Sequence, residues 1–83
     1  MEYNETWGIE YSRVTAFFDA QTDVLPTAEG HYRYGDAEIV LTRLPDKQMG
    51  SLHFARTGLT IRGETDADDI HRRFFLRFLS AGG

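Results

Sequence analysis

The 83-residue sequence contains no cysteine, so disulfides, a thiolate nucleophile and cysteine ligands for a metal are all excluded. A fold without covalent cross-links is typical of a reducing compartment, and we expect a cytoplasmic location. The first residues are acidic and polar, without the basic start and apolar run of a secretory signal. No apolar run approaches the roughly 20 residues needed to span a bilayer, so we do not expect a membrane protein.

Lysine is almost absent, with Lys47 as its single occurrence, and thirteen acidic residues outnumber nine basic ones. The net charge of −4 disfavours nucleic acid as a partner, because such binding depends on neutralising phosphates. The charge is also uneven. Residues 1–30 hold six acids against Arg13 alone, whereas residues 31–63 hold five basic residues against three acidic ones. The chain therefore begins acidic and becomes mildly basic in its middle.

Sequence motifs for common chemistry are also missing. The three serines are not in a nucleophile-elbow context, and neither glycine-rich phosphate loop is present. The histidines lack the spacing of paired metal ligands, and the acids of residues 64–69 lack the pattern of a calcium loop. The sequence therefore predicts no metal and no cofactor, and it favours a protein that is not an enzyme.

The composition is that of one ordinary folded domain. Apolar residues make up 41% of the chain and charged residues 27%, close to the averages of globular proteins. A chain of this length supports one hydrophobic core but not two. We expect a single α+β domain over residues 1–83.

The clearest local prediction is a β-hairpin with Gly35-Asp36 as its turn, between strands over residues 31–34 and 37–44. The two-residue turn sets the pairs Tyr34–Ala37, Arg33–Glu38 and Tyr32–Ile39. A second hairpin is predicted over residues 51–56 and 59–63, with Thr57-Gly58 as its turn. Strand alternation then gathers one apolar face for the core, made of Tyr32, Tyr34, Ala37, Ile39, Leu41, Leu52, Phe54, Leu59 and Ile61.

A C-terminal helix is predicted from Asp66 to about Ser80, with Thr65 as its N-cap. Its apolar stripe, expected to pack on the sheet, consists of Ala67, Ile70, Phe74, Phe78 and Ala81. Residues 20–29 read as the longest loop. Residues 6–20 fit both a strand and a helix period, and their β-branched and aromatic residues favour a long bulged strand. The two outcomes are a five-stranded meander with one helix, or a four-stranded sheet with a helix at each end.

Three groups of residues are candidates for function. Phe75, Leu76 and Leu79 fall outside the helix stripe, so they form either an interface or a part of the core that the N-terminal segment covers. His31, Arg33, His53 and Arg62 share the polar sheet face, as a binding site for an anion or nucleic acid or as an ordinary solvated surface. Tyr32, Tyr34 or His71 would supply polar groups to a ligand pocket between sheet and helix.

The preferred hypothesis is a non-enzymatic interaction module that forms a homodimer, since a small domain gains burial by self-association. The alternatives are a regulator that binds nucleic acid or an anion, and a small-ligand binding protein or enzyme.

Overall fold

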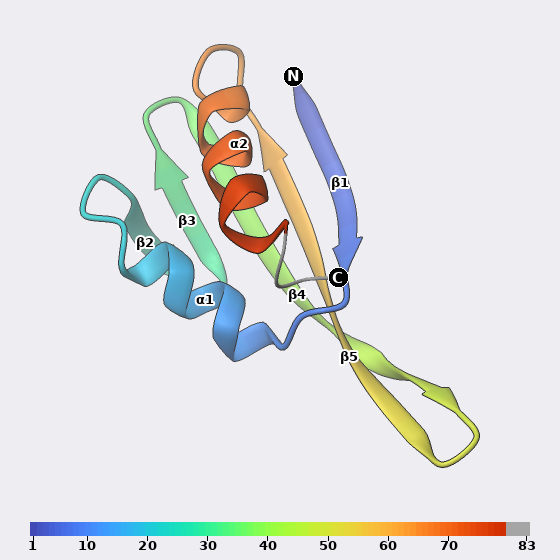
Figure 1. Ribbon diagram of the computed structural model, residues 1–83. Helices are drawn as coiled ribbons and strands as arrows, with labels where there is room; N and C mark the ends of the chain where they lie inside the picture. The colour runs from blue at the N-terminus through green and yellow to red at the C-terminus, as the bar shows by residue number, and fades with distance from the viewer. Residues whose placement is uncertain (80–83) are drawn as a thin grey trace.

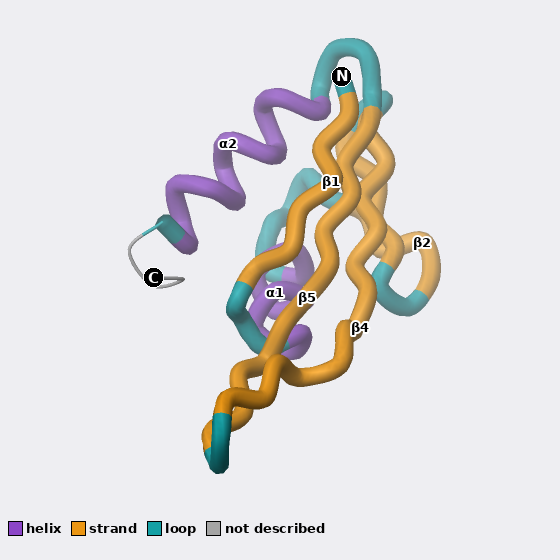
Figure 2. Tube along the Cα trace, turned by 90° about the vertical axis from the view of Figure 1, so that its right-hand side faces the viewer, coloured by secondary structure: helices purple, strands orange, loops and turns teal. Residues whose placement is uncertain are grey.

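The computed structural model describes residues 1–79 and contains a single antiparallel sheet with two helices. The elements in chain order are β1 (Glu2–Trp7), α1 (Tyr11–Asp19), β2 (Leu25–Ala28), β3 (His31–Tyr34), β4 (Ala37–Met49), β5 (Leu52–Arg62) and α2 (Ala67–Phe78). The strand order across the sheet is β1-β5-β4-β3-β2. Both helices lie in front of the sheet in Figure 1, and the side view of Figure 2 shows α2 standing off one face.

The predicted α+β class, with an antiparallel sheet on a C-terminal helix, is confirmed. Neither helix of the described chain is long and apolar enough to cross a membrane.

The ambiguous segment over residues 6–20 holds both kinds of structure. β1 ends at Trp7, and α1 begins at Tyr11 after a short turn that contains Gly8. Val14 and Phe18 are the buried residues of α1, four positions apart on one helical face. The favoured long strand is therefore wrong beyond Trp7, and the sheet has five strands together with a helix toward each end.

The hairpin of β3 and β4 has the predicted register. Tyr34 pairs with Ala37, Arg33 with Glu38 and Tyr32 with Ile39, on either side of a turn in which Gly35 has a φ of 57°. The segment expected as the longest loop contains β2, which adds a short outer strand to β3. β2 was missed because it has only four residues and includes Pro26, which is tolerated on an edge strand.

The second predicted hairpin is wrong, because Leu52–Arg62 is one continuous strand. Gly58 lies within β5, between Thr6 of β1 and Thr42 of β4, and its φ is not positive. The turn is instead at Gly50, which has a φ of 63° and follows a β4 strand that is longer than expected. Phe54 therefore pairs with Lys47, and His53 pairs with Gln48.

The core lies between the sheet and the two helices. The buried positions of α2 are Ala67, Ile70, Phe74 and Phe78, as the helix stripe predicted, whereas Ser80 and Ala81 fall outside the described residues. Phe74 has aromatic neighbours in three elements, with Trp7 in β1 at 5.1 Å, Phe18 in α1 at 5.8 Å and Phe78 in α2 at 4.9 Å between ring centroids. From the sheet, the predicted residues Ala37, Ile39, Leu41, Leu59 and Ile61 are all buried.

A reciprocal set of hydrogen bonds connects the β3–β4 turn to the start of α2. The Asp36 carboxylate accepts bonds from the backbone N–H groups of Thr65 and Asp66, each at 2.9 Å. In return, the Asp36 N–H donates to the Asp66 carboxylate at 2.9 Å. These bonds to backbone N–H groups lower the pKa of Asp36 below its ordinary value. The turn thereby fixes where α2 begins, with Asp66 rather than Thr65 at the N-cap position.

Gly35 and Gly50 provide a matched test of this connection. Both residues have a positive φ, but a side chain at Gly35 would meet the Asp66 carboxylate, whereas nothing lies within 4 Å at Gly50. We predict that Gly50→Ala costs about 1 kcal/mol of unfolding free energy through backbone strain, and that Gly35→Ala costs clearly more. Urea unfolding of both variants measures the difference, and equal losses would show that the turn contact adds nothing.

Candidate functional site

The C-terminal half of α2 carries an apolar group that the fold leaves outside. Phe75, Leu76 and Leu79, which we call the helix patch, are 38%, 62% and 55% exposed. The N-terminal segment covers only its margin, because the Trp7 ring meets Phe75 edge-on at 5.9 Å. α1 packs instead on the buried stripe, where Phe17 contacts Phe74 and Phe78. The alternative in which the N-terminal segment buries this group has little support from these contacts.

A second exposed apolar group lies on a part of the molecule that sequence reasoning missed. Beyond the pair Arg43–Thr57, β4 and β5 no longer pair with β1 or β3 and continue as a two-stranded arm, residues 44–56. Figure 1 shows this arm extending past the rest of the sheet. Pro45 lies within the register irregularity between Leu44 and Lys47, where a missing N–H is tolerated.

Three large apolar side chains share one face of the arm. Met49, Leu52 and Phe54, which we call the arm face, are 57%, 60% and 46% exposed. Met49 pairs directly with Leu52, and alternation places Phe54 on the same side as Leu52. Leu52 and Phe54 were predicted in the core, which is wrong, because the strand carries them beyond the part of the sheet that the helices cover.

The predicted anion-binding residues do not all come together. Arg33 and Arg62 lie on the sheet face opposite the helices, at the same level on β3 and β5, and His31 is two positions from Arg33. Glu38 lies between the two arginines and forms an ion pair with Arg62 at 3.2 Å. His53 is on the arm instead, away from this group. Arg33, Glu38 and Arg62 therefore alternate in charge across the strands, so these residues do not form a basic patch.

The residues expected to line a ligand pocket make hydrogen bonds to other side chains of the fold. Tyr32 donates to the Asp19 carboxylate at 2.9 Å, and burial together with this bond raises its pKa. Tyr34 donates to the Asp69 carboxylate, which raises the pKa of Tyr34. Side chains of the core cluster, Tyr32 included, fill the space between the sheet and the helices. These groups support the packing of helices on the sheet.

His71 belongs to a small cluster that joins α2 to β1. Its ring stacks on Tyr3 with centroids 3.8 Å apart, and its Nε2 is 2.9 Å from a Glu5 carboxylate oxygen. Tyr3 donates to the Asp68 carboxylate, which raises the pKa of Tyr3. The His71 side chain is only 14% exposed. Sequence reasoning missed this cluster because it joins two residues of β1 to two residues of α2 that lie more than 60 positions away, and because it matches no motif.

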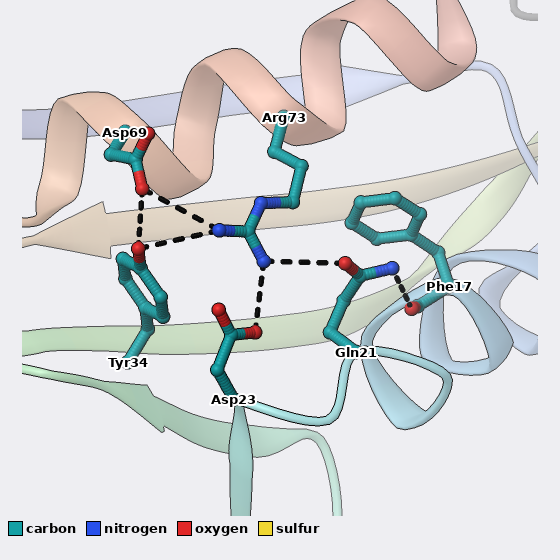
Figure 3. A network of polar contacts seen from close by, with 6 residues as sticks. All are labelled: Phe17, Gln21, Asp23, Tyr34, Asp69 and Arg73. Atoms are coloured by element: carbon teal, nitrogen blue, oxygen red, sulfur yellow. Dashed lines mark hydrogen bonds and ion pairs between the residues drawn. The ribbon is translucent and has the colours of Figure 1, made fainter.

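Arg73 is the centre of a second polar network, shown in Figure 3. It donates to Asp23 at 2.9 Å, to Gln21 at 3.3 Å and to the Tyr34 hydroxyl at 3.3 Å. An ion pair with Asp69 at 3.5 Å adds a further contact within α2. The hydrogen bond from Arg73 lowers the pKa of Asp23, and the Asp23 carboxylate in turn raises the pKa of Arg73. With its guanidinium shared among four partners, Arg73 ties α2 to the loop before β2.

No protein-family model matches the sequence, and no curated protein gives a significant match. Within residues 1–79 there is no group of three or more histidine, aspartate or glutamate side chains arranged to hold a metal ion.

The Arg73 network predicts a specific acid sensitivity. Because the folded pKa of Asp23 lies below its unfolded value of about 3.9, the carboxylate stabilises the fold above that value and loses this effect as pH falls through the folded pKa. Asp23→Asn should therefore lose less thermal stability than wild type as the pH falls from about 5 to about 2, a window that extends below the unfolded pKa.

The matched control is Asp46→Asn, which removes the same charge from the arm. It should keep the acid sensitivity of the wild type, as measured by circular dichroism melting curves at each pH. Equal acid sensitivity of Asp23→Asn and wild type would contradict the role given to Asp23.

Proposed function

We propose that the protein is a non-enzymatic interaction module that forms a homodimer through the helix patch. The observation that carries this proposal is the exposure of Phe75, Leu76 and Leu79 beside Trp7 on the outer side of α2. Contiguous exposed apolar side chains are a common mark of an association surface. Helical spacing also makes them a compact group, since Leu79 lies four positions after Phe75 and three after Leu76.

The small size of the domain supports self-association. A domain of this length buries a low fraction of the surface of its unfolded chain, so further burial of large apolar residues adds stability that the monomer lacks. At about 25 cal/mol per Å² of apolar surface, covering each of these partly exposed side chains contributes on the order of 1 kcal/mol before the costs of association. Two copies related by a twofold axis use every such contact twice.

The polar clusters support a non-enzymatic role. His71 is engaged with Glu5, and Arg73 is engaged with Asp23, in contacts that hold α2 on the rest of the fold. A catalytic acid or base must reach a substrate atom, whereas the His71 side chain is only 14% exposed and the Arg73 guanidinium is shared among four partners within the chain. An anion-binding role for the open sheet face has less support, because Glu38 pairs with Arg62 there.

The proposal predicts that charge on the helix patch separates the dimer. Wild type should show twice the monomer mass by light scattering at high concentration and dissociate on dilution. Leu76→Glu with Leu79→Glu should be a folded monomer throughout, because both side chains are exposed and carboxylates do not tolerate apolar burial.

The matched control is Leu25→Glu with Thr27→Glu, which adds the same charge to exposed positions of β2. This variant should dimerise as wild type does. A wild type that is monomeric at every concentration would overturn the proposed function, and a control that also dissociates would assign the effect to net charge rather than to the helix patch.

A further inference from the structure

We infer that the helix patch of one copy receives the arm face of a second copy, and that the exchange is reciprocal. The inference rests on the proposed function and names the other half of the interface. It assigns a role to Met49, Leu52 and Phe54, which the monomer leaves exposed.

The two apolar surfaces lie on different parts of the molecule. The arm face lies on the two-stranded ribbon that extends past the rest of the sheet, away from α2 (Figure 1). Trp7 and the helix patch lie on the side of the helices, and Trp7 pairs with Thr57 just where the arm begins. One chain therefore cannot bring its arm face onto its own helix patch, whereas two chains can.

The arm has the length that such an exchange requires. Its two strands contribute about six residues each, which at about 3.3 Å per residue gives a reach of about 20 Å. The two shorter dimensions of the molecule are 24 and 21 Å. An arm from one copy thus spans most of the width of another.

Charge favours the pairing of arm with body over the pairing of arm with arm. Residues 44–56 carry Lys47 and Arg56 against Asp46, for a net charge of +1, while the rest of the chain carries −5. Lys47 pairs with Phe54 and shares the arm face, so two arms packed together would bring like charges close. Glu5 accepts a hydrogen bond from Trp7 at the margin of the helix patch, which places an acid where the arm would arrive.

The size of the interface also favours reciprocal exchange. A stable interface buries about 800 Å² on each partner, which is more than three side chains of one helix supply. When each copy contributes both its arm face and its helix patch, six large apolar side chains per chain enter the interface. Both exposed apolar groups are then covered by one association.

The absence of cysteine makes a direct test by disulfide formation simple. Leu52→Cys or Phe54→Cys is placed in one protein, and Leu76→Cys or Leu79→Cys in another that carries a tag of different mass. Each protein is incubated alone and in each of the four mixtures in a glutathione buffer. A disulfide forms only when the two Cα atoms come within about 7 Å, so the products report which surfaces meet.

The expected result is a cross-link between the two proteins, at least tenfold more abundant in one or more mixtures than the cross-link of either protein alone. Predominant self-linking of the Leu76→Cys or Leu79→Cys protein would show helix-to-helix packing, which keeps the proposed dimer and overturns the arm exchange. Predominant self-linking of the arm variants, or no mixed product from any of the four pairs, would overturn it as well.

A charge exchange gives an independent measurement. Leu52→Lys with Phe54→Lys in one chain, and Leu76→Glu with Leu79→Glu in the other, should each be monomeric alone by light scattering. Mixed in equal amounts they should form a heterodimer, because lysines on the arm then face glutamates on the helix patch. Failure of the mixture to associate would contradict the inference, while the mass of the wild type tests the proposed function separately.

Discussion

The burial of Phe74 is the constraint on which the rest of the structure depends. Its ring is in contact with Trp7 of β1, with α1 through Phe18, and with Phe78 on its own helix. Once α2 turns this stripe inward, both helices must share one sheet face, and the opposite face stays open. This orientation of α2 directs Phe75 and Leu76 outward. Their exposure is therefore a geometric consequence of how the buried face of the helix packs.

Around that aromatic centre, polar contacts fix the orientation of the helices. Three tyrosines of the sheet, Tyr3, Tyr32 and Tyr34, each donate a hydrogen bond to an aspartate carried by a helix. Arg73 adds the connection between α2 and the loop before β2. Of the side-chain polar atoms buried among the described residues, each has a hydrogen-bond partner. These titratable groups thus hold the helices on the sheet, whereas the helix patch and the arm face remain exposed.

Local patterns predicted the parts of this fold that local physics determines. The register of the Gly35-Asp36 hairpin followed from its two-residue turn, and the stripe of α2 followed from its period. The second hairpin was misplaced because Gly58 resembles a turn residue, although it lies in the middle of a strand between two neighbours and its φ is not positive. The turn is at Gly50, which has a positive φ and was not considered as a turn residue from the sequence. The contacts of His71 with Glu5 and of Arg73 with Asp23 join residues 66 and 50 positions apart, which no periodicity reports.

The arm differs from the rest of the sheet in how it is held. Residues 44–56 have only each other as strand neighbours, and no helix lies over them to complete a core. A lone two-stranded ribbon is marginally stable in water. Its amide protons are therefore expected to exchange through local opening, well before the global unfolding that exposes those of Ile39 or Ile61. A partner that binds this ribbon must supply the free energy that orders it. The affinity of such a partner therefore depends on the stiffness of the arm as well as on the contacts made.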